Sequence, residues 1–132
     1  MYTARAMRHQ TNSREPSADP VLQRYETQFR ALRAQLAELW FFCKGTILQR
    51  RLTCGKPECA CAVTPARRHG PYFEWTYKVA GKTVNVRLAA EEAAAYREAA
   101  AQWRRLRTLL RRLEGLSRRA LKRKGRLLRS RY

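Results

Sequence analysis

Four residues with soft donor atoms lie within sixteen positions of this sequence: Cys54, Cys59, Cys61 and His69. Zn²⁺ prefers thiolate and imidazole ligands in tetrahedral sets, and closely spaced cysteines let a short loop wrap the ion without a large core. The pattern therefore predicts a structural zinc site. Because four protein ligands would leave no coordination position for water, we do not expect Lewis-acid catalysis at this metal.

The Cys-x4-Cys-x-Cys spacing is unusual, so other interpretations stay open. The cysteines could be reduced, inert thiols, which are common in protein interiors. A disulfide framework would need an oxidising compartment, whereas the N-terminal residues contain no apolar signal segment. Cys43 is an alternative to His69 as the fourth ligand, although it ends an apolar helical stripe and is expected to pack in the core.

The C-terminal part of the chain concentrates positive charge. Between Arg104 and Arg131 there are thirteen Lys or Arg residues and a single acid, Glu114. Like charges one helical turn apart, such as Arg107 and Arg111, each cost an isolated helix about 0.2 to 0.5 kcal/mol. Phosphates would remove this repulsion, so we expect the segment to become ordered on a polyanion. The residues expected to bind nucleic acid here are Arg104, Arg105, Arg107, Arg111, Arg112, Arg118, Arg119, Lys122, Arg123, Lys124, Arg126, Arg129 and Arg131.

A second basic cluster surrounds the predicted metal loop. A loop held by a metal could present arginine side chains to base edges, where bidentate contacts to guanine are the commonest specific contact. Tyr72, in the strand that follows, could stack on an unpaired base or pack in the core. The cations expected to bind nucleic acid in this cluster are Arg50, Arg51, Lys56, Arg67 and Arg68.

The overall charge agrees with a polyanionic partner. The 132 residues include 29 Lys or Arg and 10 Asp or Glu, which gives a formal net charge of +19. We expect nucleic acid rather than a membrane surface, because the basic region lacks a broad Trp- and Phe-rich face for insertion. A transmembrane span is not expected, since the most apolar run, residues 36–43, is too short and contains Glu38.

Two long helices are predicted to flank the metal loop. Asp19 and Pro20 are typical of a helix start, and Gly45 is placed to end this helix after Lys44. A second helix is predicted to open at Glu91 and Glu92. Both carry apolar residues at spacings of three and four, as in a coiled-coil seam. The seam positions are Leu22, Tyr25, Phe29, Leu32, Leu36, Leu39 and Cys43 in the first helix, and Tyr96, Ala99, Trp103, Leu106, Leu110, Leu113, Ser117 and Ala120 in the second.

Between the helices the pattern favours β structure. Residues 46–53 predict a strand that runs into Cys54, and residues 72–88 predict a hairpin that turns at Ala80 and Gly81. A two- or four-residue turn places the aromatic residues of one strand opposite Leu88, Val86 and Val84 of the other, whereas a three-residue turn breaks this match.

The predicted fold class is therefore α+β. An N-terminal helix and a long basic C-terminal helix form an antiparallel hairpin, with a small antiparallel β meander and the zinc loop at its tip. Homodimerisation through a parallel seam is an alternative. We divide the chain into a disordered basic tail (1–18), a zinc-stabilised helix–β–helix domain (19–114) and a basic helical extension (115–132).

The motif Cys-Gly-Lys-Pro-Glu-Cys-Ala-Cys at 54–61, followed by His-Gly-Pro-Tyr at 69–72, resembles that of a family of small, uncharacterised bacterial proteins. The resemblance covers roughly residues 45 to 113. It implies a bacterial origin, an association with mobile elements, and metal-ligand roles for Cys54, Cys59, Cys61 and His69. It implies no activity.

Taken together, these features predict a non-enzymatic, zinc-stabilised nucleic-acid-binding protein in the bacterial cytoplasm, associated with the nucleoid. It would be a DNA-binding accessory or a subunit of a nucleoprotein complex, with DNA favoured over RNA. The chain shows no Ser/His/Asp set, phosphate loop or placed carboxylate pair. The alternatives are an RNA-binding or ribosome-associated protein and a coiled-coil adaptor that binds an acidic partner.

Overall fold

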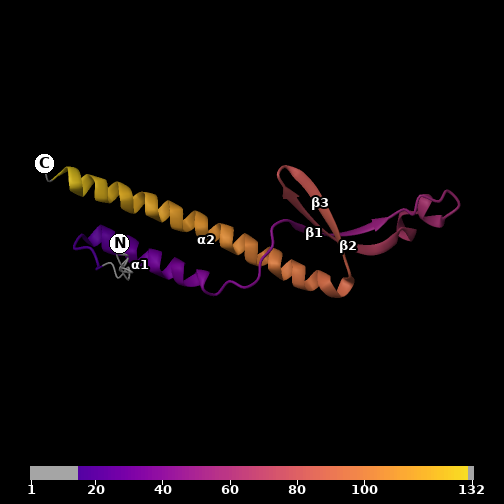
Figure 1. The fold of residues 1–132 in the computed structure, drawn as a ribbon, viewed down its shortest axis with the longest axis horizontal. Helices are drawn as coiled ribbons and strands as arrows, with labels where there is room; N and C mark the ends of the chain where they lie inside the picture. The colour runs from indigo at the N-terminus through magenta and orange to yellow at the C-terminus, as the bar shows by residue number, and fades with distance from the viewer. Residues whose placement is uncertain (1–14, 131–132) are drawn as a thin grey trace, which may run out of the picture.

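The computed structural model describes residues 15–130. The chain forms helix α1 (Pro20–Leu36), strand β1 (Thr46–Leu52), two short 3₁₀ turns, strands β2 (His69–Val79) and β3 (Lys82–Leu88), and helix α2 (Ala90–Arg129). The helices lie side by side and antiparallel at one end of the molecule, and the three-stranded sheet and its loop form the opposite end (Figure 1). The predicted α+β class and helical hairpin are confirmed. The predicted disordered tail lies, apart from residues 15–18, outside the described residues.

Helix α1 begins where its local sequence indicates. The Asp19 carboxylate accepts a hydrogen bond from the Leu22 N–H at 3.0 Å, and Pro20 occupies the first helical position, where its missing N–H costs nothing. Its end differs from the prediction. The helix stops at Leu36 instead of Lys44, so Leu39 and Cys43 are not part of a helical seam.

The early end of α1 has a tertiary cause. After a turn at 37–38 the chain runs extended along α2. The Trp40 N–H donates to Gln102 Oε1 at 3.1 Å, and the Cys43 N–H donates to the Ala99 carbonyl at 3.2 Å. These contacts across the molecule satisfy backbone groups that a longer helix would have satisfied internally.

Gly45 does not cap a helix but lets two backbones approach closely. Its φ is +98°, and a Cβ at this position would lie 2.2 Å from the Thr76 carbonyl oxygen. Only glycine tolerates both conditions, so Gly45 sets the entry of the chain into β1 beside β2.

The sheet has the predicted register. Its order is β1-β2-β3, all antiparallel, and Phe73, Trp75 and Tyr77 stand opposite Leu88, Val86 and Val84. The turn has two residues with positive φ, 49° at Ala80 and 79° at Gly81, as a tight hairpin turn requires. The aromatic face meets α2, where the rings of Trp75 and Tyr96 lie 5.2 Å apart.

Helix α2 is a single element of 40 residues, about 60 Å long. It begins at Ala90, as the acids Glu91 and Glu92 of its first turn predict, and it continues through Gly115 and Gly125. The division of the chain at residue 114 stays a prediction. Within the described residues, neither helix combines the length and the apolar character that a membrane span requires.

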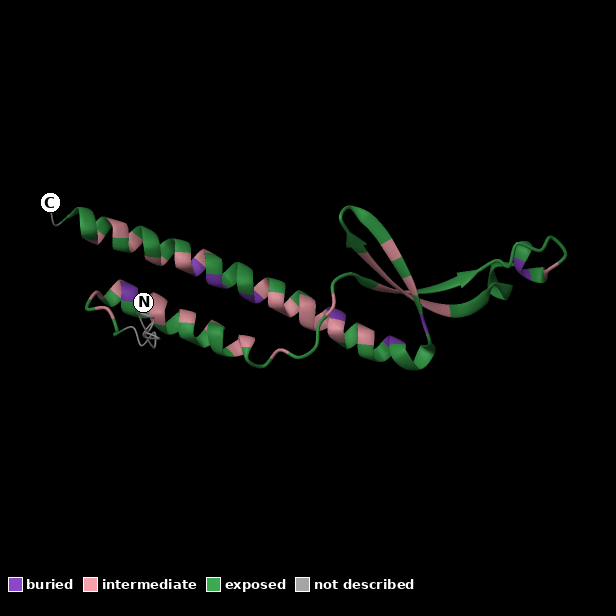
Figure 2. Ribbon diagram, viewed as in Figure 1, coloured by how far each residue is buried: buried purple, intermediate pink, exposed green. Residues whose placement is uncertain are grey.

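The core is thin, and Figure 2 shows how few residues it contains. The buried apolar residues of the helices and sheet are few and lie mainly on α2, where it packs against α1 and the sheet. Those buried in the described part of the chain, apart from Cys61 in the loop, are Leu22, Leu88, Ala93, Ala100, Leu109, Leu113 and Leu116.

Candidate metal centre and cationic surfaces

The loop with the predicted ligands closes between two paired strands. Leu52 at the end of β1 stands opposite His69 at the start of β2. Residues 53–68, which we call the metal loop, therefore leave and re-enter the sheet at one point. The backbone then turns twice in short 3₁₀ segments, Ala60–Ala62 and Pro65–Arg67. The sheet therefore positions His69, and the turns bring the cysteines back to it.

All four predicted ligands come together in this loop. Their donor atoms lie within 4.8 Å of one another. The Sγ atoms of Cys54 and Cys61 are 3.5 Å apart, and the Cys59 Sγ is 3.5 Å from the His69 Nε2. The prediction that these four residues form a potential metal-binding cluster is confirmed.

The spacing of the donor atoms fits a tetrahedral ion. Two sulfurs that each lie about 2.3 Å from a tetrahedral zinc are separated by about 3.8 Å. A disulfide requires about 2.05 Å between sulfurs, so the Cys54 and Cys61 sulfurs at 3.5 Å are not bonded, and all four cysteines of the chain are free thiols. Three thiols and one imidazole form the donor set that structural zinc sites use.

The electrostatics of the loop favour a thiolate at Cys59. Hydrogen bonds, first from the Cys61 backbone and then from the Cys61 and Cys54 thiols, lower its pKa. The Cys54 N–H donates to the Cys61 sulfur at 3.4 Å, which favours the Cys61 thiolate. Burial and the neighbouring thiols outweigh this bond, so the pKa of Cys61 is raised.

Cys43 does not belong to the cluster. It is half-buried beside α2, and its Sγ faces the Tyr96 carbonyl oxygen at 3.9 Å. Burial raises its pKa, as expected of a packed thiol. The geometry thus places His69, and not Cys43, with the three loop cysteines.

Apolar packing contributes little to the loop. In residues 53–68, all of which the structure describes, Cys61 alone is buried, while Val63 is 85% exposed. A segment with so little core needs cross-links to hold one conformation. The four convergent ligands are the feature that could supply them.

The cations predicted to bind nucleic acid around this loop are exposed. Arg50 lies on β1, with its Nε 3.7 Å from a Glu74 carboxylate oxygen. Tyr72 lies beneath Arg87, whose guanidinium carbon is 4.4 Å from the ring centre, so its ring packs within the sheet. The remaining predicted cations of the loop region, all exposed, are Arg51, Lys56, Arg67 and Arg68.

Three cations of α2 are paired within the fold. Arg105 lies 2.7 Å from Glu38, Arg118 lies 2.7 Å from Glu114, and Arg123 makes two contacts of 2.8 and 3.0 Å with Asp19. Arg131 lies outside the described residues. The other predicted cations of α2, all exposed, are Arg104, Arg107, Arg111, Arg112, Arg119, Lys122, Lys124, Arg126 and Arg129.

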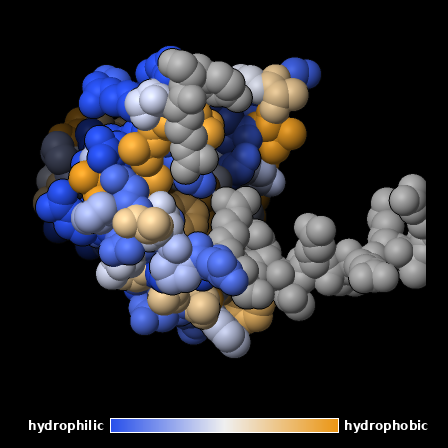
Figure 3. Space-filling model, turned by 90° about the vertical axis from the view of Figure 1, so that its left-hand side faces the viewer, coloured by the Kyte–Doolittle hydropathy of each residue, from blue (hydrophilic) through white to orange (hydrophobic). Residues whose placement is uncertain are grey.

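The two cationic regions do not form one surface. The metal loop lies at one end of the long axis of the molecule, and the C-terminal half of α2 lies at the other (Figure 1). Figure 3 looks at the end of the hairpin and shows hydrophilic side chains interspersed with apolar ones. A nucleic acid that touched both regions would have to span most of the molecule.

The local sequence does not indicate the tertiary contacts of several residues of functional interest. Asp19 was predicted only as a helix cap, yet it also pairs with Arg123, 104 positions away. Trp40 and Phe41, predicted as helical, are 69% and 77% exposed in the extended segment beside α2. Val21 and Tyr25 line a small pocket with four cations of α2. Only long-range contacts reveal these arrangements.

Comparison with known proteins gives one family. The family model described as "Domain of unknown function (DUF6788)" matches residues 22–98. The match includes α1 from Leu22 onward, the sheet, the metal loop and the start of α2, whereas the most basic part of α2 lies beyond it. No curated protein and no solved structure matches this chain.

Proposed function

Because the chain belongs to the DUF6788 family, whose description assigns no activity, we propose a function from the molecule's own surfaces: non-enzymatic, zinc-stabilised binding of nucleic acid. The observation that carries this proposal is the concentration of positive charge, with almost no acids, along α2. From Arg104 to Arg129, Glu114 is the single acid, and it is already paired with Arg118.

Several exposed cations of α2 lie on the side turned away from α1. Successive residues of an α-helix are rotated by about 100°, so the helical positions of cations and core residues can be compared. The buried residues Leu109, Leu113 and Leu116 share one side. The opposite side carries Arg104, Arg111, Arg118 and Arg129. This face can therefore meet phosphates without opening the hairpin.

We favour duplex DNA as the polyanion. A straight helix with an uncovered cationic face fits the DNA major groove, which is about 12 Å wide. The major groove of A-form RNA is too narrow and deep for such a helix. The protein would act as an accessory to a DNA transaction or in a nucleoprotein complex of the bacterial nucleoid, and the resemblance of the metal-loop motif favours an association with mobile elements.

Zinc is the metal we assign to the loop. The ligand set of three sulfurs and one nitrogen favours zinc over the oxygen-seeking cations Mg²⁺ and Ca²⁺. In a closed site of four protein ligands the ion would be structural, and the loop would present Lys56, Arg67 and Arg68 in a fixed arrangement. We assign the protein no catalytic step.

The proposal is tested by the salt dependence of DNA binding. Affinity of the full chain for a 24-base-pair duplex and for a hairpin RNA is measured by fluorescence anisotropy between 50 and 200 mM salt. The variant R104Q/R107Q/R111Q is compared with R24Q/R30Q/R33Q, which removes the same charge from exposed positions of α1. We expect the α2 variant to lower the slope of log K against log salt by about 0.9 for each lost phosphate contact.

Two results would contradict the proposal. Equal losses in both variants would mean that net charge, and not the α2 face, carries binding. No binding by the parent protein at 50 mM salt would remove nucleic acid as the partner. Tighter binding to the hairpin RNA at matched salt would move the protein to the RNA-binding class.

A protein adaptor is the second candidate, and the exposed aromatic side chains of Trp40 and Phe41 favour it. Large exposed apolar side chains in sequence are typical of protein-binding surfaces. A complex that survives nuclease and high salt, and is lost on W40A/F41A, would support this function.

A further inference from the structure

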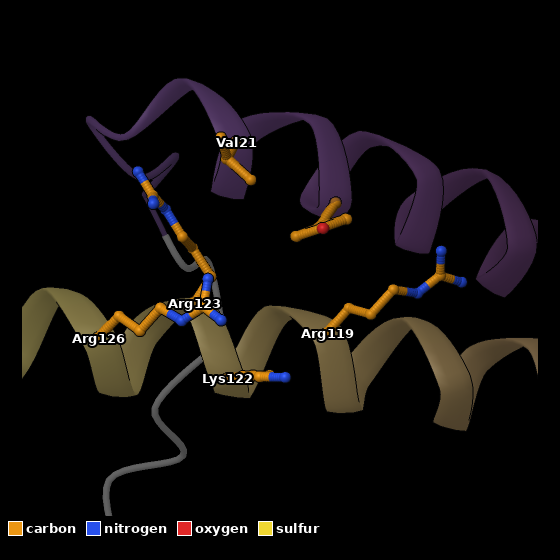
Figure 4. A pocket seen from close by; sticks show the side chains of 6 residues that line it. Val21, Arg119, Lys122, Arg123 and Arg126 are labelled. Carbon is orange, nitrogen blue, oxygen red and sulfur yellow. The ribbon is translucent and has the colours of Figure 1, made fainter.

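A shallow pocket lies between the start of α1 and the last turns of α2. Its volume is about 250 Å³, and Figure 4 shows four cationic side chains on α2 opposite Val21 of α1. We call this pocket the notch. Its lining residues are Val21, Tyr25, Arg119, Lys122, Arg123 and Arg126.

One of the four cations of the notch holds the helices together. Arg123 is bound on two sides by the Asp19 carboxylate, at 2.8 and 3.0 Å, and both side chains are partly buried. This pair neutralises Asp19 and fixes the start of α1 against α2.

The other three cations have no acidic partner among the residues that the structure describes. Within residues 15–130, no carboxylate lies within ion-pair distance of Arg119, Lys122 or Arg126. Along α2, Lys122 and Arg123 each lie one helical turn from both Arg119 and Arg126. The free protein thus holds like charges side by side, and a bound anion would remove their repulsion.

The size and the donors of the notch point to a phosphate group. Pockets for drug-sized ligands have volumes of about 300 to 1,000 Å³, so the notch fits a single phosphate with part of its sugar better than a whole ligand of that kind. Arginine and lysine are the usual donors to phosphate oxygens. The first-turn N–H groups of Leu22 and Gln23 are already bound by Asp19, so recognition here falls to side chains.

We propose that the notch binds one backbone phosphate of the nucleic acid, held by Arg119, Lys122 and Arg126. This inference rests on the proposed function and adds a defined contact to it. The notch opens on the flank of the hairpin between α1 and the cationic side of α2. One phosphate seated there would set the position of the hairpin along the duplex, as backbone contacts do in other complexes.

The sharpest test fills the notch without changing the charge. Val21→Trp places a large side chain in the notch and leaves the net charge at its parent value, while Thr27→Trp makes the same change at an exposed position of α1 outside it. We expect Val21→Trp to weaken binding of the 24-base-pair duplex roughly tenfold, the cost of losing contacts to a charged group. Thr27→Trp should bind as the parent does. Equal affinities of all three proteins would overturn the proposal.

A second pair of variants covers the case in which Val21→Trp disturbs the fold, as judged by circular dichroism. R119Q/K122Q/R126Q is compared with R104Q/R107Q/R111Q, which removes the same charge outside the notch. We expect the notch variant to bind DNA more weakly than its control and to melt at a higher temperature than the parent, because repulsion is removed. Equal affinity in the two variants would show that the notch is only part of a diffuse cationic surface.

Inorganic phosphate separates failure of this inference from failure of the proposed function. Phosphate is titrated into the full chain while the arginine side-chain N–H signals are followed by NMR. The protein could bind neither the duplex nor the RNA and still show saturable shifts that Val21→Trp abolishes. That result would overturn nucleic acid as the source of the phosphate. If Val21→Trp leaves duplex binding unchanged, the proposed function stands, but the notch is not the phosphate site.

Discussion

The metal loop and the helical hairpin lie at opposite ends of the molecule and hold their conformations by different interactions. The loop has one buried residue, Cys61, and four donor atoms within 4.8 Å of one another. The hairpin has an apolar seam along α2 and a two-point ion pair between Asp19 and Arg123. The loop is therefore suited to stabilisation by a few strong metal–ligand bonds, whereas the hairpin is stabilised by many weak contacts.

This difference indicates that the two ends can fail separately. A metal ion stabilises a short segment through directional bonds that need no surrounding core. Apolar burial is proportional to area and needs long matched surfaces, which two helices provide. Changes at one end are therefore expected to leave the other end in place.

The largest effect is expected from Cys59→Ser. Loss of one ligand should release the metal and unfold the loop, because ligand binding and loop folding are coupled. Metal content, measured by elemental analysis, should fall from one equivalent to nearly none, while the helical circular dichroism signal is kept. Cys43→Ser, which lies outside the cluster, is the matched control and should retain the metal. One equivalent of metal in Cys59→Ser would remove this residue from the ligand set.

Leu109→Ala should destabilise the hairpin and spare the metal. The predicted seam contains Leu110, which is 52% exposed, whereas its neighbour Leu109 is 2% exposed. Truncation of a buried leucine costs about 2 to 5 kcal/mol. Denaturant unfolding, followed by the helical signal, measures the loss. Leu121→Ala is the control, because Leu121 is 66% exposed and its truncation should change stability by less than about 0.5 kcal/mol. If Leu109→Ala also releases the metal, the two ends are coupled.

The Asp19 and Arg123 pair should make the stability of the hairpin depend on pH. The hydrogen bond from Arg123 is the main cause that lowers the pKa of Asp19 from 3.8 to about 2. Since the folded pKa is below the ordinary value, the stabilisation is present above about pH 4 and is lost as the pH falls toward 2.

Asp19→Asn tests this dependence with a small expected effect. At pH 7 its Tm should lie roughly 5 °C below that of the parent, and the two should converge near pH 2. Asn still caps the helix, so the change reports on the ion pair. Glu114→Gln removes an exposed pair with Arg118 and should shift the Tm by less than about 2 °C. A pH-independent difference for Asp19→Asn would assign its effect to packing.

Several features of the candidate site could be predicted because they depend on short-range chemistry. The ligand set follows from the donor types and the close spacing of Cys54, Cys59 and Cys61. His69 is included because β1 and β2 pair at Leu52 and close the loop. The cationic side of α2 could be predicted from composition, since the charges share one helix.

Other features could not be predicted, because they depend on residues far apart in the chain. The apolar spacing continues from Leu36 to Cys43, and nothing local ends the helix at Leu36. The contacts of Trp40 and Cys43 with α2 end it. In the same way, Arg123 resembles its neighbours in sequence, but in the structure it alone among the described cations pairs with Asp19.

The sequence by itself determined the start of α1, the hairpin register around Ala80 and Gly81, and the four candidate metal ligands. The deciding features are a local cap for the helix, a tight turn with alternating apolar residues for the hairpin, and closely spaced donor side chains for the ligands. The tertiary structure alone decided the end of α1, the close approach at Gly45, and the notch beside Arg123. The physical reason is that each of these depends on which surfaces meet when α1 and the sheet pack on α2.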